Sequence, residues 1–313
     1  MSITQKLKKG AAWTLGRALP IQKNKVVFSS FYGRGASDNP KAIVDALAQR
    51  PEKLDIVWLA KDPAHAGVPD NVRVVPYDTS AAIRELSTAR VWVDNCRKGA
   101  HVKKDGQYYM QTWHGFALKR IERDVADKLN TPENAAYAEY AKRDSAQIDA
   151  IISNSTFMTE IYQKSFWYHG AVLEYGSARN DILVHPPADA KHQVQQALHL
   201  PNDCQIIMYA PTFRADHSLD AYQLDYQAVC RACAQRFGGN WVMLVRLHPN
   251  VMKLAKDLKF DNQTTFDATS VDDMQLLLAG CDAVITDYSS LMFDFALTRR
   301  PCFQFAMDID AYK

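Results

Sequence analysis

A histidine flanked by cations stands directly after one of the apolar runs of the sequence. Residues 111–115 read Gln-Thr-Trp-His-Gly, and Lys119, Arg120 and Arg123 follow this histidine, His114, at short spacing. Imidazole is the side chain best suited to accept a hydroxyl proton near neutral pH, and nearby cations favour an anionic ligand. Periodicity alone leaves a second interpretation open, in which His114 is a loop residue that caps a helix.

Two segments later in the chain carry groups that could hold a phosphate. Thr212 and Arg214 directly follow another apolar run, although Pro211 and Thr212 could equally make a simple turn. Arg246 and His248 are two residues apart on an extended segment, so both side chains can reach one anion. A solvated strand end is the alternative for that pair.

Residues 286–290 form a hydroxyl-rich turn between an apolar run and an apolar helix. Asp287, Ser289 and Ser290 lie where free backbone N–H groups and the helix dipole bind phosphate, and the serine hydroxyls add donors. The alternative is that Ser289 is only the N-cap of the helix. Asp294 follows on the apolar helix, where a carboxylate needs a partner, and a ribose or polyol diol is one candidate.

Familiar cofactor motifs are absent from the sequence. It contains no P-loop, no G-x-G-x-x-G fingerprint and no metal cage, and Gly33-x-Gly35 is a glycine turn without the third glycine. Helix N-termini, arginine and histidine would then carry the charge of a bound phosphate. We therefore expect that no metal and no cofactor is required.

Short β-branched or aromatic runs alternate with helical stretches along most of the chain. Such alternation implies a parallel sheet with helices on both faces, and ligands of open α/β sheets bind beyond the carboxyl ends of the strands. Asn39 as N-cap and Pro40 as first residue predict a helix that runs to about Arg50. We expect strands at residues 26–31, 54–60, 73–76, 91–94, 108–112, 150–153, 172–175, 205–209, 241–247, 283–286 and 302–305. Further helices are expected at residues 188–200, 222–237, 271–278 and 289–297.

The pattern begins afresh after residues 185–187, His-Pro-Pro, where adjacent prolines interrupt both periodicities. We therefore predict a basic leader over residues 1–22, an N-terminal Rossmann-like domain over 23–186 and a C-terminal Rossmann-like domain over 187–313. Two such sheets would face one another across a cleft. The last predicted strand ends only a few residues before Lys313, so the second domain looks incomplete.

Charge is distributed unevenly, although the net charge is only +2, from 37 lysines and arginines against 35 acidic residues. Seven basic residues and no acidic residue precede Asp38, so the chain begins with a basic leader. A near-neutral protein of this kind is not a general nucleic-acid binder. The leader fits a short basic helix that lies on an anionic membrane, with a disordered basic tail as the alternative.

The remaining composition indicates a globular protein of a reducing compartment. With 313 residues, 47% of them hydrophobic, the chain is long enough for about two domains, which excludes collagen-like, disordered and disulfide-scaffold classes. Cys230 and Cys233 stand within a predicted helix, where we expect buried structural thiols rather than a redox or zinc motif. The sequence contains no run of 18 apolar residues that would predict a membrane-spanning helix, and the N-terminus lacks the pattern of a signal peptide.

Taken together, these motifs resemble the CDP-glycerol glycerophosphotransferase family of teichoic-acid and capsule synthesis. They follow one another in order from residue 39 to residue 295, which is far more specific than any one of them. The matching segments are Asn39–Ile43, Gln111–Gly115, Ile152–Ser155, Tyr175–Asp181, Tyr209–Arg214, Arg246–Pro249 and Ile285–Phe295.

The resemblance implies a GT-B-type α/β fold, with the donor in the C-terminal domain and the acceptor approaching the N-terminal one. It implies transfer of glycerol phosphate or a related polyol phosphate from CDP-glycerol or CDP-ribitol to a hydroxyl of a lipid-linked polyprenyl acceptor, with release of CMP. We accordingly expect a peripheral enzyme at the cytoplasmic face of the cell membrane, which contacts anionic lipid through residues 1–22. No nucleic-acid partner is expected, and a homo-oligomeric state is left open.

The roles of single residues also follow from the resemblance. His114 becomes the general base that deprotonates the acceptor hydroxyl, and His248 with Arg246 would hold the donor pyrophosphate. The other substrate-binding residues that it implies are Thr212, Arg214, Asp287, Ser289, Ser290, Asp294, Arg179, Asn180 and Lys119.

The sequence departs from the family pattern at three places. Ala178 stands where the family usually has proline, and Phe213 stands where a tryptophan is common. Members normally continue beyond the strand at residues 302–305 with helices that complete the donor domain, so the resemblance implies a chain shortened at its C-terminus. Two alternative functions remain: a GT-B glycosyltransferase that uses a nucleotide sugar, and a non-catalytic remnant that binds CDP-polyols or membranes.

Overall fold

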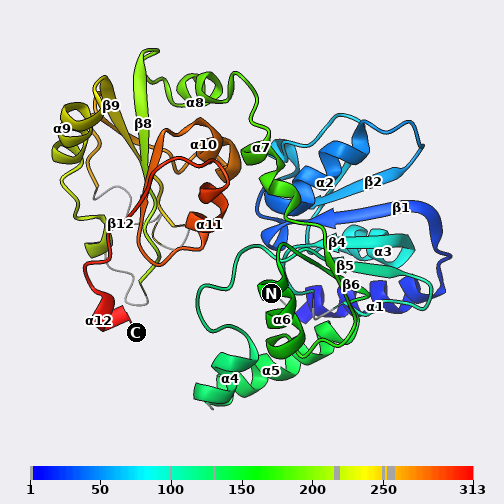
Figure 1. The fold of residues 1–313 in the computed structure, drawn as a ribbon. Helices are drawn as coiled ribbons and strands as arrows, with labels where there is room; N and C mark the ends of the chain where they lie inside the picture. The colour runs from blue at the N-terminus through cyan, green and yellow to red at the C-terminus, as the bar shows by residue number, and fades with distance from the viewer. Residues whose placement is uncertain are drawn as a thin grey trace. The chain divides into compact units, whose positions relative to one another are not determined.

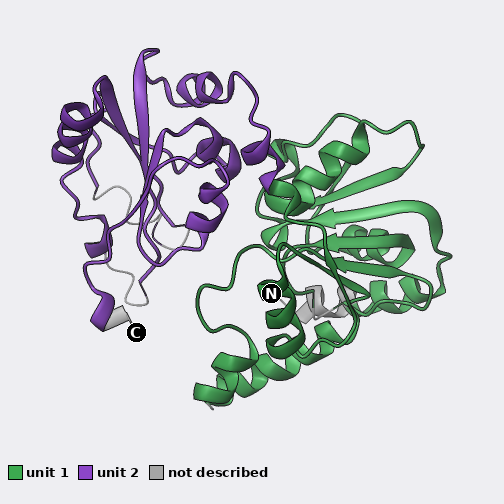
Figure 2. Ribbon diagram, in the orientation of Figure 1, with its two compact units in different colours: residues 1–179 green, residues 180–313 purple. Residues whose placement is uncertain are grey.

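The chain is built from two compact units, residues 1–179 and residues 180–313 (Figure 2). The computed structural model describes residues 3–98, 101–129, 131–214, 219–248, 251 and 258–312, with side chains from residue 10 to residue 310. Each unit contains one parallel β-sheet with helices packed against it (Figure 1). We call them unit 1 and unit 2.

Unit 1 contains, within its described residues, a seven-stranded sheet in the order β3-β2-β1-β4-β5-β6-β7. All neighbouring strands pair in parallel. The strands are β1 (Gln22–Ser29), β2 (Asp55–Ala60), β3 (Arg73–Pro76), β4 (Ala89–Asp94), β5 (Tyr108–Gln111), β6 (Ala150–Ser153) and β7 (Ala171–Glu174). The helices are α1 (Ile3–Ala18), α2 (Asp38–Ala48), α3 (Ser80–Thr88), α4 (Arg123–Leu129), α5 (Pro132–Ser145) and α6 (Thr156–Ser165).

The two faces of this sheet are both buried, because successive side chains of a strand point to opposite faces. Val27 of β1 packs with Leu86 of α3 and Met158 of α6 in one hydrophobic cluster. Phe28, the next residue, packs with Val44 of α2 in the other. The β-branched and aromatic strand residues are therefore enclosed on both sides, as expected for a parallel sheet covered by helices.

Unit 2 repeats this plan with a five-stranded parallel sheet in the order β10-β9-β8-β11-β12 across its described residues. The strands are β8 (Cys204–Tyr209), β9 (Asn240–Val245), β10 (Thr265–Asp267), β11 (Ala283–Thr286) and β12 (Cys302–Gln304). The helices are α7 (Asp181–Val184), α8 (Ala190–Leu198), α9 (Tyr226–Phe237), α10 (Met274–Gly280), α11 (Leu291–Ala296) and α12 (Ile309–Tyr312).

Alternation along β8 again divides the core of unit 2 into two clusters. Ile206 and Met208 belong to the cluster with residues of α8, α10 and α11, whereas Ile207 and Tyr209 belong to the cluster with residues of α9. Figure 1 shows α9 on one side of this sheet and α10 and α11 on the other. Cys230 and Cys233 of α9 belong to the second cluster as free, buried thiols, and burial raises the pKa of Cys230 to about 12. The prediction of structural thiols at this C-x-x-C is therefore confirmed.

The strand predictions are confirmed at all eleven positions, with ends shifted by up to four residues. Strand β10, which has only three residues and follows a polar turn, is not among the predicted strands. In that turn, Oδ1 of Asp261 accepts hydrogen bonds from the backbone N–H groups of residues 263, 264 and 265. A strand this short leaves no alternating pattern in the sequence, so only its pairing with β9 reveals it.

The prediction that Asn39 is the N-cap of α2 is wrong. The helix begins at Asp38, with Ser37 as its N-cap, and Asn39 is buried at 4% exposure. Its side chain bonds to segments that are distant in sequence, which are described below with the site. The Asn-Pro pair is typical of a helix start, but tertiary contacts gave the amide another role.

The boundary between the compact units lies at residues 179 and 180, seven residues before the predicted one. Leu183 of α7 is the reason, because its side chain is 2% exposed and belongs to the core cluster of unit 2 that contains α10. The prolines at 186 and 187 therefore lie inside the second unit.

The predicted leader helix corresponds to α1, and its second half is part of the fold of unit 1. Trp13 packs against the cluster that contains α3, and Nζ of Lys104 donates to the carbonyls of Gly16 (3.2 Å) and Leu19 (2.7 Å). The lysine side chains of the leader lie outside the residues whose side chains are described. None of the described helices has the length and apolar composition needed to cross a membrane.

The contact between α1 and α3 leads to a prediction for two glycines of one helix. A Cβ added at Gly16 would lie 2.2 Å from Oγ of Ser87, whereas a Cβ at Gly10 would meet no atom within 4 Å. We expect Gly16→Ala to lower the free energy of unfolding by about 1–3 kcal/mol through overpacking. Gly10→Ala is the matched control and should raise that free energy by up to about 1 kcal/mol, because alanine favours helix. Urea denaturation measures both, and equal effects would contradict the packing described here.

Candidate functional site

The carboxyl edge of the sheet in unit 2 brings together three residues that the sequence analysis singled out. The strand order reverses between β8 and β11, which is where open α/β sheets bind ligands. Oδ1 of Asp287, after β11, accepts a hydrogen bond from the backbone N–H of Thr212, after β8, at 2.8 Å. Oδ2 of Asp287 lies 2.8 Å from Nη2 of Arg214. One buried carboxylate thus fixes both turns against each other.

Thr212 has a side-chain hydroxyl that no described residue binds. Its Oγ1 is buried and has no hydrogen-bond partner among the described residues. A buried hydroxyl without a partner is uncommon, because it loses its hydration without compensation. Thr212 is therefore suited to bind a polar ligand group, which fits its predicted role.

Arg214 is held as a fixed cation by two carboxylates. Its Nε and Nη2 donate to Asp308 at 2.7 and 2.9 Å, and its guanidinium lies 5.2 Å from the centre of the Tyr288 ring. Burial by itself lowers the pKa of Arg214, but the hydrogen bonds to Asp308 and Asp287 outweigh it and raise the pKa. Asp308 is not among the predicted site residues, since no motif near it indicates a role at the ends of β8 and β11.

Arg246 and His248 make different contacts after β9. Nη1 of Arg246 donates to the carbonyls of Ala268 (2.7 Å), Thr269 (3.1 Å) and Val271. Burial lowers the pKa of this arginine. The ring of His248 stacks on Phe213, with centroids 5.2 Å apart. Arg246 therefore anchors the segment that follows β10, and joint binding of one anion by the pair stays a prediction.

Asp294 and Asn180, both predicted to bind substrate, bind one another inside unit 2. Nδ2 of Asn180 donates to Oδ1 of Asp294 at 2.8 Å, and Nε2 of Gln275 donates to Oδ2 at 3.3 Å. These three side chains join α7, α10 and α11. Asp294, which is 6% exposed, thus finds amide partners within the unit, so it needs no ribose or polyol to compensate its burial.

Ser289 and Ser290 lie at the start of α11, as predicted, but Ser290 and not Ser289 is the N-cap residue. The side chain of Ser290 makes no capping hydrogen bond. Oγ of Ser289 accepts from the backbone N–H of Leu291 at 3.4 Å. Both residues are half-buried, so the Ser290 hydroxyl remains suited to an external ligand.

In unit 1, His114 follows β5, beside the turn that follows β4. Its Nδ1 lies 2.5 Å from the backbone carbonyl of Asn95, and its ring stacks on Trp113 with centroids 4.4 Å apart. A carbonyl can only accept, so Nδ1 carries the proton and the neutral ring keeps Nε2 as its proton acceptor. The helix-cap interpretation of His114 is therefore not needed.

The Asn95 carbonyl is itself held firmly at the point where the strand order of unit 1 reverses, between β1 and β4. The side chain of Asn95 accepts from the N–H of Phe31 (2.9 Å) and donates to Oγ of Ser30 (3.1 Å). Beside it, Nζ of Lys98 pairs with Asp94 at 2.6 Å, and both side chains are buried. Neither Asn95 nor Lys98 is among the predicted site residues, although the polar Asp-Asn pair at the end of an apolar strand is a signal.

Asn39, wrongly predicted as a cap, joins three segments around His114. Its Nδ2 donates to the carbonyls of Thr112 (3.4 Å) and Trp113 (3.2 Å), and its Oδ1 accepts from the N–H of Arg179 (3.1 Å). The guanidinium of Arg179, predicted to bind substrate, forms a buried ion pair with Asp38 at 2.8 Å. Lys119 lies exposed in the loop after β5, and its role stays a prediction.

Comparison with known proteins identifies the family. The family model of CDP-glycerol:poly(glycerophosphate) glycerophosphotransferases matches residues 12–313. The chain belongs to this family. A solved structure, that of the wall teichoic acid polymerase TagF, shares 29% identity and superposes with a TM-score of 0.84 over 100% of this chain and 82% of its own. This likeness confirms the predicted GT-B-type α/β fold.

Two curated relatives from this glycerophosphotransferase family share about a third of their residues with the chain. The teichoic acid poly(glycerol phosphate) polymerase of Staphylococcus epidermidis is 33% identical over 93% of this chain and 41% of that protein. The teichoic acid glycerol-phosphate transferase of Staphylococcus aureus is 32% identical over 93% of this chain and 76% of that protein. The chain therefore spans about two fifths of the first and about three quarters of the second.

The bonds of Asn39 lead to a prediction for stability. Asn39→Ala removes one partner each from the buried carbonyl of Thr112, the part-buried carbonyl of Trp113 and the buried N–H of Arg179, and an unpaired buried group costs about 1–3 kcal/mol. We expect the free energy of unfolding to fall by about 2–4 kcal/mol, as measured by urea denaturation. Asn71→Ala is the matched control, since this exposed amide donates to one carbonyl, that of Ala48, and its loss should cost under about 0.5 kcal/mol. A fall no larger than that of the control would contradict the role assigned to Asn39.

Proposed function

We propose that this chain transfers glycerol phosphate from CDP-glycerol to a hydroxyl of a lipid-linked acceptor and releases CMP. The observation that carries the proposal is the Nδ1 hydrogen bond of His114, which leaves Nε2 as a proton acceptor in a member of this family. The names of the two curated relatives, a glycerol-phosphate polymerase and a glycerol-phosphate transferase, favour glycerol over ribitol as the polyol. The polymer is then of the teichoic-acid or capsule type.

The proposed reaction is a displacement at the phosphorus that carries glycerol. The acceptor oxygen forms a bond to this phosphorus while the phosphorus–oxygen bond to CMP breaks. Nε2 of His114 takes the acceptor proton, and the electron pair of the broken bond leaves with CMP. Glycerol phosphate ends as a phosphodiester on the acceptor, so atoms and charge balance without an added reactant.

Unit 2 supplies the groups for the donor in this proposal. Arg214 is a fixed cation, Thr212 offers a buried hydroxyl, and Ser290 offers a hydroxyl that makes no capping hydrogen bond at the start of α11. His248, stacked on Phe213, provides a second group for the phosphates. These side chains can offset the charge that develops on the leaving CMP, and we propose that no cofactor is needed.

Activity assays with point variants test the proposed roles of the two histidines. We expect His114→Ala to lower the rate of CMP release from CDP-glycerol by about 100- to 10,000-fold, the usual contribution of a general base. Binding of CDP-glycerol, measured by calorimetry, should survive in His114→Ala because the proposed donor groups lie in unit 2. His248→Ala should instead weaken this binding.

The exposed histidines His65 in unit 1 and His192 in unit 2 provide matched controls, and their alanine variants should leave both quantities unchanged. An unaltered rate in His114→Ala would contradict its role as base. Release of UDP from UDP-sugars, with no CMP from CDP-glycerol, would favour the glycosyltransferase alternative. Binding without turnover would favour a non-catalytic protein.

We further propose that the chain works as a peripheral protein at the cytoplasmic face of the membrane. The lipid-linked acceptor places the reaction at a membrane surface, and the leader carries basic residues without an acidic one. Leu15 of α1 is 71% exposed. Leu118 and Leu129, which flank exposed cations around α4, offer a further apolar contact.

Charge reversal in the leader tests this contact without removing α1, which is part of unit 1. Each basic residue near an anionic surface contributes about 1 kcal/mol, so Lys6→Glu, Lys8→Glu and Lys9→Glu together should weaken binding to phosphatidylglycerol vesicles by more than about 10-fold. Co-sedimentation measures this binding. The same reversal at the exposed residues Arg50, Lys53 and Lys61 is the control for net charge. An equal loss of vesicle binding in both triple variants would contradict the role proposed for the leader.

A further inference from the structure

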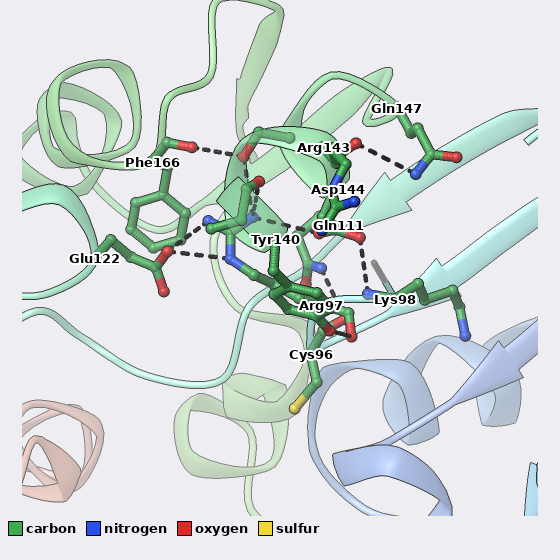
Figure 3. A network of polar contacts seen from close by, with 12 residues as sticks. Cys96, Arg97, Lys98, Gln111, Glu122, Tyr140, Arg143, Asp144, Gln147 and Phe166 are labelled. Atoms are coloured by element: carbon green, nitrogen blue, oxygen red, sulfur yellow. Dashed lines mark hydrogen bonds and ion pairs between the residues drawn. The ribbon is translucent and has the colours of Figure 1, made fainter. Parts of the chain in front are cut away.

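We propose that Arg97 is a positioning residue for His114, because its buried guanidinium holds both ends of the loop that carries this histidine. The loop spans residues 112–122, between β5 and α4. Arg97 follows β4 and lies on a different segment from either end of the loop (Figure 3). The inference rests on the proposed function, in which His114 is the base.

Glu122 connects the far end of the loop to Arg97. Nε and Nη2 of the guanidinium both donate to Oε2 of Glu122, at 3.1 and 2.6 Å (Figure 3). Nη1 donates to Asp144 (3.3 Å), Ser145 (3.0 Å) and the carbonyl of Ala141 (3.1 Å), all on α5. The side chain of Arg97 is only 2% exposed, so α5 and the buried surroundings fix the position of its charge.

Trp113 connects the near end of the loop to the same guanidinium. The Cζ atom of Arg97 lies 5.9 Å from the centre of the Trp113 ring and 5.4 Å from that of Phe166. Trp113 and Phe166 contact each other edge to face at 4.6 Å, and the ring of His114 stacks on Trp113. A desolvated cation over an aromatic face is attracted to it, so the indole is held between Arg97 and His114.

Backbone strain at both ends of the loop explains why the contacts with Arg97 are needed. Trp113 has φ 51° and Glu122 has φ 56°, in the left-handed region that residues other than glycine rarely adopt. Strained conformations of this kind persist only where the surroundings hold them. Both of these strained loop residues contact Arg97, Trp113 through its ring and Glu122 through its carboxylate.

Arg97 affects the proposed base through the orientation of the His114 imidazole. The Nδ1 bond to the Asn95 carbonyl requires the ring to keep its stacked position on Trp113. If the indole shifts, this bond lengthens, and the proton of the neutral ring is shared between Nδ1 and Nε2. The fraction of His114 with a free Nε2, and with it the rate of proton transfer, then falls.

Arg73 offers a comparison in the same unit, at a more exposed position. It also bridges two carboxylates, with Nε 2.8 Å from Asp55 and Nη2 3.2 Å from Glu85. Arg73 and Asp55 are, however, the first residues of β3 and β2, at the edge of the sheet opposite to the strand ends near His114. Arg73→Lys therefore reports the loss of a bridging guanidinium far from His114, at a side chain that is 48% exposed where that of Arg97 is 2% exposed.

The experiment compares Arg97→Lys with Arg73→Lys. Lysine keeps a cation next to Glu122 and Asp144, so neither carboxylate is buried without a counter-charge, but it lacks the planar fork and the stacking face of arginine. We expect Arg97→Lys to lower kcat for CMP release by about 10- to 100-fold, the cost of a misplaced catalytic group. The KM for CDP-glycerol should stay within about two-fold, because the donor groups lie in unit 2.

A spectroscopic readout separates this inference from the proposed function. With ¹⁵N-labelled histidine, the His114 signals of the wild-type protein should report a proton on Nδ1, and in Arg97→Lys the two nitrogen shifts should move toward each other. Arg73→Lys should leave both the signals and kcat unchanged. An unchanged His114 spectrum in Arg97→Lys, or equal losses of kcat in the two variants, would overturn the inference. If the wild-type protein transfers no glycerol phosphate, the proposed function fails, whereas the spectra still decide the role of Arg97.

Discussion

The hydrogen bond between Nδ1 of His114 and the carbonyl of Asn95 determines which nitrogen of the ring can accept a proton. The rest of unit 1 around it can be understood as support for this bond. Asn95 is tied to the turn after β1, and Asn39 ties the backbone before His114 to α2. The role of base proposed for His114 requires both its tautomer and its direction to be fixed, and these polar contacts fix them together.

Both units use the same physical solution at the point where their strand order reverses. Parallel strands end with backbone groups that no neighbouring strand satisfies, and a short polar side chain after the strand can bind them. In unit 1, the side chain of Asn95 after β4 accepts from the N–H of Phe31 after β1. In unit 2, Asp287 after β11 accepts from the N–H of Thr212 after β8. The segments that carry the candidate site are thereby held rigidly on the two sheets.

The partners inside each unit divide the predicted site residues into two groups. Arg179 and Asp294 are buried and paired with Asp38 and with amides, so their first role is to hold the structure together. Thr212 has a buried hydroxyl without a partner in the described part of the chain, and Ser290 makes no capping bond at the start of α11. Groups of the second kind can bind a substrate without breaking an existing contact, which makes them the stronger candidates for the donor site.

The sequence by itself determined the alternation of strands and helices, the parallel sheets and the segments that carry His114, Thr212 and Asp287, because periodicity and strand ends are local properties. Only the tertiary structure decided which polar groups pair. Asn39 has the local pattern of a helix cap but binds backbone groups more than seventy residues away, and Asp308 reaches Arg214 across a similar separation. Such pairings depend on which strand ends become neighbours, and the order of strands in a sheet leaves no trace in the sequence around a single residue.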